Sequence, residues 1–216
     1  MKALCSIGSG PHADLLAVSR PTFAAYAERH GYELITSTES VRDRPPAWAK
    51  VPMLREAVDA YELVLWIDAD AVIVDDRDDV ADLADRELAL VRHRNGEVAV
   101  PNTGVMVLRG GTFARELLDR MWAAKRYADH PWWENAALLD LLGYDLPSAL
   151  EPRWRRLGRP ARPLRHARPS RFFDGTRFLP LEWNSGYLDR TESPRIVHCL
   201  GVPVEQRLRD MRAALG

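Results

Sequence analysis

The sequence predicts an α/β protein in which a mostly parallel central sheet is flanked by helices. Short apolar runs alternate with helical stretches through the first half of the chain, and this order is typical of parallel sheets. The run Leu63–Ile67 is apolar at every position, which indicates a strand that helices cover on both faces. The 216 residues show no internal repeat, and such a length suits one domain. We therefore expect a single domain over residues 1–216.

Apolar runs and turn residues mark the first elements. Residues 3–7 form the first expected strand, and the glycines and proline of residues 8–11 end it in a turn. A helical stretch follows, and Pro21 is expected to begin a second helix because proline fits a first helical turn. Gly31 is a stop signal for that helix, and residues 32–36 are the next expected strand.

Apolar runs and turn residues also predict the remaining elements. Residues 47–61 carry apolar side chains at helical spacing, so we expect a helix that leads into the buried strand. The paired glycines at 110 and 111 turn the chain into a later helix. The further strands are expected at residues 88–91, 105–108 and 195–199, and the further helices at 112–128, 132–142 and 204–215.

The composition argues against several functional classes. Lys and Arg number 30 against 31 Asp and Glu, which gives a net charge of -1. The chain therefore has no general attraction to nucleic acid. No segment approaches the roughly 18 uncharged apolar residues of a membrane helix, and the first residues do not form a signal peptide. We expect a cytoplasmic protein without a membrane span, in which Cys5 and Cys199 are buried thiols.

Residues 151–171 differ from the rest of the chain, because they hold eight arginines and several prolines with no helical or strand period. We expect a basic loop or insertion here and interpret it as solvated. The alternative is a site for an acidic or phosphorylated acceptor, since a guanidinium group binds two phosphate oxygens at once.

The pair Asp68 and Asp70 directly follows the buried strand. Residues two apart in extended chain point to the same side, so both carboxylates face one spot at the end of the sheet where α/β proteins bind ligands. Carboxylate oxygens suit Mg²⁺ or Mn²⁺, and these ions offset the charge on a departing diphosphate. The simpler alternative is two acids that are exposed to solvent and have no function. Charged residues between two apolar runs are costly to bury, however, so a functional role is favoured.

Two other features are weaker candidates for a metal site. The acidic turn at residues 75–79 lacks the Gly and Glu spacing of a calcium loop, so a solvated turn is favoured. His198 ends the last expected strand and is either a core residue or a third metal ligand, since imidazole tolerates Mn²⁺ better than Mg²⁺. Gly201 leaves room for backbone close to a phosphate.

The chain has seven tryptophans, and most are expected in the core. Aromatic faces also stack on sugar rings, which gives a few of them a second interpretation. Those that could line a sugar site are Trp132, Trp133 and Trp183.

Several segments resemble the galactosyl/mannosyl/xylosyl-transferase family, which includes fungal mannan galactosyl- and mannosyltransferases and plant xyloglucan xylosyltransferases. Residues 48–54, Tyr61 and residues 65–71, with Asp68-Ala69-Asp70, carry the main likeness. The other segments that fit in the same order are residues 26–32, 102–109, 133–138 and 196–201. The resemblance covers about residues 3–201, nearly the whole chain.

This resemblance implies a Rossmann-like domain of the A-type glycosyltransferase fold. It also implies a retaining transferase that moves a hexose or pentose from a nucleotide-diphosphate sugar, with a UDP-sugar favoured and a GDP-sugar possible. The implied cofactor is Mn²⁺ or Mg²⁺, and by position the metal ligands are Asp68, Asp70 and His198. The expected acceptor is a small molecule, a peptide or a glycan.

The resemblance also places residues around the donor. The positions near the donor sugar and the reacting centre are Asn102, Gly104, Glu134 and Asn135. Lys50 is placed near the carboxylates or the diphosphate; a solvent-exposed lysine on an amphipathic helix is the alternative. The chain departs from the family at Asn135, because an acid followed by glutamine is more usual there.

Two other functions stay open at this point. A sugar nucleotidyltransferase also needs carboxylates that bind metal, but it usually carries a longer, basic, glycine-rich loop than residues 8–11. A catalytically silent domain that binds sugar nucleotides is the alternative outside enzymes, and the retained Asp68, Asp70 and His198 argue against it.

Overall fold

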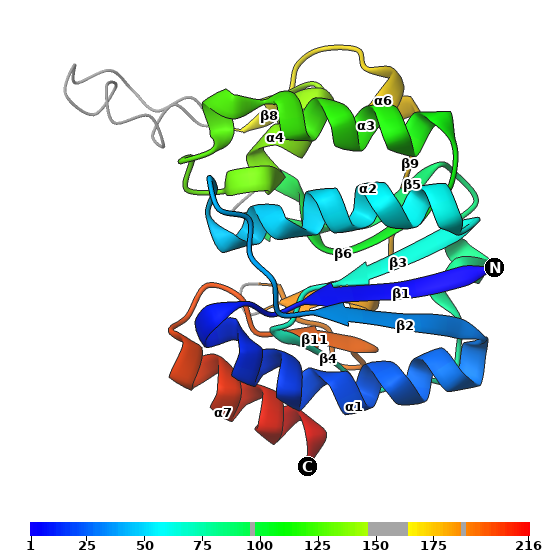
Figure 1. Ribbon diagram of the computed structural model, residues 1–216, viewed down its shortest axis with the longest axis vertical. Coiled ribbons are helices and arrows are strands. Elements are labelled where there is room, and N and C mark those ends of the chain that lie inside the picture. The colour runs from blue at the N-terminus through cyan, green and yellow to red at the C-terminus, as the bar shows by residue number, and fades with distance from the viewer. Residues whose placement is uncertain (96–97, 147–163, 187–188) are drawn as a thin grey trace.

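A computed structural model describes residues 1–95, 98–146, 164–186 and 189–216. Its centre is a six-stranded sheet in the order β2-β1-β3-β6-β5-β9. The strands of this sheet are β1 (Lys2–Ile7), β2 (Tyr32–Ser37), β3 (Leu63–Ile67), β5 (Leu88–Asn95), β6 (Val98–Arg109) and β9 (Thr176–Leu179). Of these six, β6 alone runs against the others. The α/β class and the mostly parallel sheet are thus confirmed (Figure 1).

Helices cover both faces of the central sheet (Figure 1). On one face lie α2 (Lys50–Ala60), α3 (Thr112–Ala123), α4 (Trp133–Leu141) and α6 (Arg171–Asp174). On the other face lie α1 (Ala13–His30) and α7 (Val204–Leu215). The connections contain the 3-10 helices η1 (Gly10–His12), η2 (Pro46–Ala49), η3 (Val80–Leu83), η4 (Lys125–Tyr127) and η6 (Leu181–Asn184).

Two smaller sheets complete the described part of the chain. One joins β10 (Ser185–Gly186), β11 (Ile196–His198) and β4 (Ala71–Ile73), and the other pairs β7 (Tyr144–Asp145) with β8 (Arg165–His166). The first of these matters for the site, because only residues 68–70 separate β4 from the end of β3, while β11 comes from the far end of the sequence.

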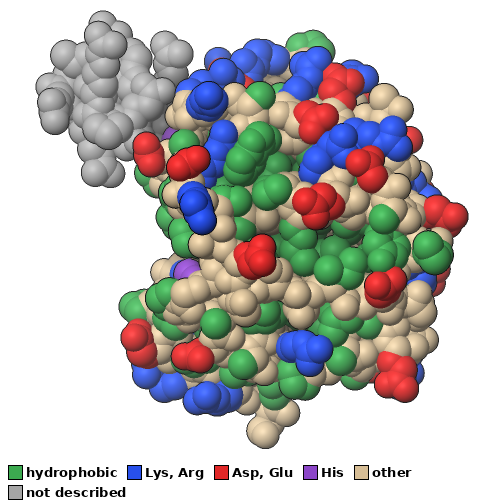
Figure 2. Space-filling model, in the orientation of Figure 1, with side chains coloured by type: hydrophobic (Ala, Val, Ile, Leu, Met, Phe, Trp, Pro, Cys, Tyr) green, Lys and Arg blue, Asp and Glu red, His purple; other side chains and the backbone are tan. Residues whose placement is uncertain are grey.

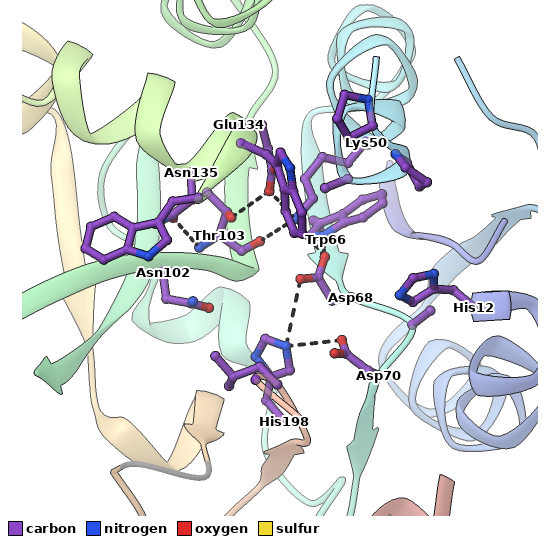
Figure 3. A pocket seen from close by; sticks show the side chains of 18 of the residues that line it. His12, Lys50, Trp66, Asp68, Asp70, Asn102, Thr103, Glu134, Asn135 and His198 are labelled. Atoms are coloured by element: carbon purple, nitrogen blue, oxygen red, sulfur yellow. Dashed lines mark hydrogen bonds and ion pairs between the residues drawn. The ribbon is translucent and has the colours of Figure 1, made fainter. Parts of the chain in front are cut away.

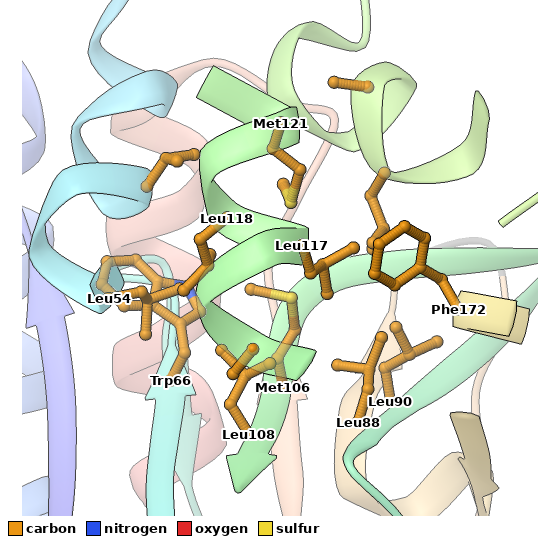
Figure 4. Packing of buried hydrophobic residues seen from close by; sticks show 14 of the residues in the cluster. Leu54, Trp66, Leu88, Leu90, Met106, Leu108, Leu117, Leu118, Met121 and Phe172 are labelled. Atoms are coloured by element: carbon orange, nitrogen blue, oxygen red, sulfur yellow. The ribbon is translucent and has the colours of Figure 1, made fainter. Parts of the chain in front are cut away.

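Each central strand sends alternate side chains into two separate cores. In β3, Val64 and Trp66 pack on the side of α2 and α3, whereas Leu65 and Ile67 pack on the side of α1. Figure 4 shows the first core, in which α3 lies over β3, β5 and β6. Burial on both faces is the reason that Leu63–Ile67 is apolar throughout and does not alternate.

The prediction that Pro21 begins a helix is wrong. α1 runs without a break from Ala13 to His30 and holds Pro21 in its interior. Buried apolar side chains on both sides of the proline, Leu16 and Phe23 among them, keep one helix against the sheet. The Thr22 hydroxyl donates to the Ser19 carbonyl in the same turn (2.8 Å), whereas the carbonyl that the proline leaves without an amide donor is that of Ala17, four residues before it.

Other boundaries differ by a few residues. The helix expected at residues 47–61 begins with the 3-10 turn η2, and the strand expected at 105–108 extends to Val98–Arg109. Part of the basic segment, residues 151–163, lies outside the described residues; its end forms β8 and begins α6. Cys5 and Cys199 are buried free thiols, as predicted, and burial raises the pKa of both. No helix in the described ranges has both the length and the apolar character needed to cross a bilayer.

Asp79 ties β1 and β2 to α1, the helix that lies between them in the chain. Its carboxylate accepts hydrogen bonds from Lys2 Nζ (2.7 Å), Tyr32 Oη (2.7 Å), Tyr26 Oη (3.1 Å) and the Ala81 amide (3.0 Å). Burial raises the pKa of the Asp79 carboxyl, but these donors lower it more, so its pKa lies below the usual 3.8. The stability that Asp79 contributes is therefore present above pH 3.8 and lost as the pH falls through the lowered pKa.

We expect Asp79→Asn to destabilise the protein by about 2 kcal/mol at pH 7, because hydrogen bonds to a charged acceptor are lost. The deficit should shrink as the pH falls below 3.8, where the wild-type carboxyl also becomes neutral. Urea unfolding followed by circular dichroism at several pH values measures both effects. A deficit that stays constant down to pH 3 would contradict this role for the ionised carboxylate.

Candidate active site

A cavity opens at the carboxyl ends of β1 and β3, where α/β sheets bind ligands. Its volume is about 540 Å³. The loop after β1, the start of α2, the end of β3, the start of α4 and the end of β11 all contribute to its lining. The surface is hollowed at the left edge in Figure 2, where the loops at these strand ends meet in Figure 1.

Asp68, Asp70 and His198 come together in this cavity (Figure 3). Asp68 follows the last residue of β3, and Asp70 precedes β4. Antiparallel pairing of β11 with β4 sets His198 beside Ala71. His198 Nε2 lies 3.2 Å from Asp70 Oδ1 and 3.8 Å from Asp68 Oδ2. One candidate ligand atom from each of the three residues lies within 4.8 Å of the others.

The hydrogen bonds of His198 fit a cation between these groups. Asn184 Nδ2 donates to Asn102 Oδ1 (2.9 Å), so Asn184 Oδ1 accepts from His198 Nδ1 (2.9 Å). When the imidazole is neutral, its proton then sits on Nδ1 and the lone pair of Nε2 faces Asp70. Two such acceptors 3.2 Å apart repel each other unless a proton or a metal ion lies between them. Two carboxylates and an imidazole are a donor set that suits Mn²⁺.

The charge of Asp70 is also controlled by its neighbours. Burial raises the pKa of the Asp70 carboxyl, but His198 and Arg207 lower it more, so its pKa lies below the usual range. Arg207 Nη1 donates to Asp70 Oδ2 at 2.8 Å. Asp70 is therefore ionised at neutral pH, as a metal ligand must be.

A series of hydrogen bonds through Asn184 and Asn102 holds the His198 ring in position. Asn102 Oδ1 accepts hydrogen bonds from Asn184 Nδ2 and from the Gly104 amide (2.8 Å). A Cβ atom at Gly104 would lie 2.1 Å from His198 Cε1, so only glycine fits there. Gly104 O in turn accepts from the Asp68 amide (2.8 Å). Of the two predicted residues, Asn102 bonds to the amide that holds His198, and Gly104 leaves room for the His198 ring. Gly104 does not line the cavity.

Lys50 is buried and links two carboxylates. Its Nζ lies 2.7 Å from Asp68 Oδ1 and 2.9 Å from Glu134 Oε1. Trp66 Nε1 donates to the same oxygen of Asp68 (2.7 Å). Burial lowers the pKa of Lys50, but Asp68 and Glu134 raise it more, so it stays charged. The alternative of a solvent-exposed lysine is wrong, because apolar packing of α2 turns this side chain inward.

Glu134 and Asn135 lie at the start of α4, on the side of the cavity away from His12 (Figure 3). Glu134 Oε1 accepts from Thr103 Oγ1 (3.1 Å), whereas Oε2 is buried without a partner among the described residues. Burial raises the pKa of Glu134, and Lys50 offsets only part of this effect. Asn135 Oδ1 accepts from the Thr103 amide (3.1 Å), so its Nδ2 group keeps its donors for other contacts.

The sequence analysis did not predict two residues that contribute to the site. Arg207, on α7, carries no motif, although the predicted helix includes it. Asn184, in η6, stands in a segment without any periodic signal. Only the fold shows that Arg207 contacts Asp70 and that Asn184 contacts His198. Gly201, which was predicted, lines the cavity with φ 81°, a backbone conformation that favours glycine.

Two other candidates fall outside the site. In the acidic turn, Asp75 and Asp78 pair with Arg195, and Asp79 bonds to Lys2. No second group of three possible ligands occurs among the residues that the structure describes. Trp183 is buried in the core (1% exposed) and does not line the cavity, so the idea that it binds sugar is wrong.

Comparison with known proteins agrees with the likeness seen in the sequence. Residues 22–99 match the family model described as the galactosyl transferase GMA12/MNN10 family. This match confirms the family resemblance. The matched range contains Lys50, Asp68 and Asp70, but it ends before His198 and Glu134.

One relative of this chain is an uncharacterized alpha-1,2-galactosyltransferase of Schizosaccharomyces pombe. It is 37% identical over 76 residues, which is 32% of this chain. The aligned segment spans only 18% of the length of that protein.

Solved structures of glycosyltransferases share the fold of the whole chain. A glycosyltransferase involved in glycosylation of the major capsid of PBCV-1 aligns with TM-score 0.67 over 98% of both chains, at 14% identity. The galactosyltransferase LgtC, solved with donor and acceptor sugar analogs, aligns with TM-score 0.57 over 99% of this chain and 96% of that one, at 11% identity. The fold is therefore that of the A-type glycosyltransferases.

Proposed function

We propose that the chain is a retaining glycosyltransferase that moves a sugar from a nucleotide-diphosphate sugar to an acceptor hydroxyl. The observation that carries the proposal is the convergence of Asp68, Asp70 and His198 in the lining of the cavity, at the end of β3. These three residues are the proposed ligands of a divalent metal, with Mn²⁺ favoured by the imidazole. The family match and the fold of the structural neighbours support the same reaction class.

The leaving diphosphate would be stabilised by positive charge near the proposed metal ligands. When bound, the metal supplies charge that offsets the developing charge on the leaving phosphate. Arg207 lines the cavity and contacts Asp70, so its guanidinium can also donate hydrogen bonds to a phosphate placed there. Lys50 is already neutralised by Asp68 and Glu134, so it is proposed to position Asp68 and not to bind phosphate.

The reacting sugar would lie between the proposed metal ligands and the start of α4. The anomeric carbon loses its bond to the leaving phosphate oxygen, and the acceptor oxygen forms a bond to the same face. The acceptor proton passes to the leaving phosphate oxygen. Glu134 Oε2, which is buried and has no partner among the described residues, would stabilise the positive charge on the ring, and Asn135 Nδ2 would donate to a sugar hydroxyl.

The favoured donor is a UDP-sugar, and galactose is the first sugar to test. The fungal relative is named an alpha-1,2-galactosyltransferase, and LgtC is named a galactosyltransferase. Nucleotide-linked galactose carries an α bond, so an α-linked product corresponds to retention.

Proton NMR of the product tests this proposal. With UDP-galactose, Mn²⁺ and simple sugar acceptors, we expect an α-anomeric signal in the first product formed. A β-anomeric product would contradict retention. Binding of UDP without donor hydrolysis or transfer would favour the silent sugar-nucleotide domain instead.

A further inference from the structure

We infer that Arg207 is a built-in counter-ion of Asp70 that weakens the binding of a lone divalent metal and makes tight metal binding depend on the diphosphate. This inference rests on the proposed function and adds how the same site takes up its two charged ligands. It comes from the contacts and the position of one arginine on α7.

The guanidinium group of Arg207 is fixed at two points. Its Nε donates to Val202 O (2.7 Å) and its Nη1 donates to Asp70 Oδ2 (2.8 Å). Val202 lies in the turn between β11 and α7, so these contacts join that turn to the end of the central sheet. The Arg207 side chain is 22% exposed and that of Asp70 is 9% exposed, so water screens the pair only in part. A cation therefore lies beside Asp70 before any ligand binds.

The two carboxylate oxygens of Asp70 have different partners. Oδ1 lies 3.2 Å from His198 Nε2, on the side of the proposed metal, whereas Oδ2 accepts from Arg207. While Arg207 stays in place, Asp70 can offer the metal one oxygen and not two. The positive charge of Arg207 also repels a metal ion bound to the same carboxylate. Both effects weaken the binding of a metal ion on its own.

The charges at the site are nearly balanced before any ligand binds. The charged groups paired there are Asp68, Asp70, Glu134, Lys50 and Arg207. Three carboxylates and two cations give this group a net charge of -1 while His198 is neutral. A divalent ion changes that charge to +1, whereas the same ion would neutralise the group without Arg207. Because metal affinity depends on the charge of the ligand set, Arg207 lowers it.

A diphosphate supplies the negative charge that the metal-bound site lacks. Arg207 lines the cavity, and a guanidinium group carries five N–H donors. Among the described residues, its hydrogen bonds are made by Nε and Nη1 and none by Nη2. The Nη2 group is therefore available to phosphate oxygens next to the proposed metal. Metal and diphosphate should then strengthen each other's binding by the same factor.

The test compares two uncharged variants, Arg207→Gln and Arg207→Met, with Arg207→Lys, which keeps the positive charge. Arg209→Gln is the matched control, because Arg209 is exposed on the same helix, bonds to Gln206 and does not line the cavity. Calorimetry and the EPR signal of free Mn²⁺ give Kd for Mn²⁺ alone, at pH 8 so that protons do not compete. Calorimetry also gives Kd for UDP and for uridine, which has no phosphate, with and without Mn²⁺.

We expect both uncharged variants to bind Mn²⁺ alone about tenfold more tightly than wild type, which is the order of effect of one partly screened charge beside the metal. The factor by which Mn²⁺ strengthens UDP binding should fall severalfold in the same variants. Arg207→Lys and Arg209→Gln should stay within about threefold of wild type, and uridine should gain nothing from Mn²⁺ in any variant. Mn²⁺ alone should also raise the Tm of Arg207→Gln more than that of wild type, because it neutralises the carboxylate left unpaired.

A merely structural role for Arg207 predicts the opposite sign, because a disordered site would bind Mn²⁺ less tightly. Unchanged or weaker binding of Mn²⁺ alone in the uncharged variants would overturn the inference, and so would an unchanged gain of UDP affinity from Mn²⁺. Arg207→Gln can still donate a hydrogen bond to Asp70, so it keeps the test open if circular dichroism shows that Arg207→Met does not fold. Glycosyl transfer survives these results as long as wild type binds UDP more tightly with Mn²⁺. If wild type gains nothing from Mn²⁺, the proposed metal-dependent function falls, and the inference with it.

Discussion

Replacing both Asp68 and Asp70 with asparagine is expected to lower turnover of UDP-galactose by about a thousandfold or more. The two carboxylates supply the proposed charged ligands of the metal, and charge stabilisation by such an ion is worth several kcal/mol, or about three powers of ten. Asparagine has nearly the same shape, so the fold should survive the exchange. UDP release under saturating Mn²⁺ measures the effect, and circular dichroism checks the fold.

The matched control for this prediction is Asp76→Asn. Asp76 lies in the acidic turn that was the weaker metal candidate, and its carboxylate pairs with Arg29 at the surface. Turnover of this variant should stay within about twofold of wild type, since isolated surface pairs contribute little. Near-normal turnover of the Asp68→Asn/Asp70→Asn variant would show that the metal assignment is wrong.

Lys50→Met is expected to be the most destabilising single change at the site. It leaves the buried carboxylate of Glu134 without its ion-pair partner, and breaking a buried pair in this way costs about 3–5 kcal/mol. The deficit should shrink as the pH falls through the raised pKa of Glu134, because protonation removes the unpaired charge. Activity should fall about a hundredfold, since Asp68 also loses a hydrogen bond that positions it.

A double-mutant cycle separates these two effects. Lys50→Met/Glu134→Gln removes both charges, so it should recover much of the stability and little of the activity. Lys125→Met is the control, because Lys125 is exposed in η4. Urea unfolding gives the stability and UDP release gives the rate. Equal stability of Lys50→Met and wild type would contradict the stabilising role of the buried ion pair between Lys50 and Glu134.

The central part of the fold was predictable because its signals are local. The run Leu63–Ile67 is apolar at every position because both faces of β3 are covered. The error at Pro21 has the opposite cause, since tertiary packing on either side of the proline overrides its local preference.

The site was predictable in part for a similar reason. Asp68 and Asp70 are close in sequence, so their convergence follows from strand geometry alone. His198 was placed with them by the family resemblance. Asn184 and Arg207 lie far from these aspartates along the chain, and only the pairing of β11 with β4 and the position of α7 bring them near. No local pattern could have revealed them.

The central claim is that Asp68, Asp70 and His198 hold a metal that binds a nucleoside diphosphate. Titration calorimetry of UDP, with and without Mn²⁺, on wild type and the Asp68→Asn/Asp70→Asn variant tests it most directly. We predict that wild type binds UDP at least about tenfold more tightly with Mn²⁺, and that the variant loses this gain. Equal UDP affinity with and without Mn²⁺, or a gain that persists in the variant, would contradict the claim.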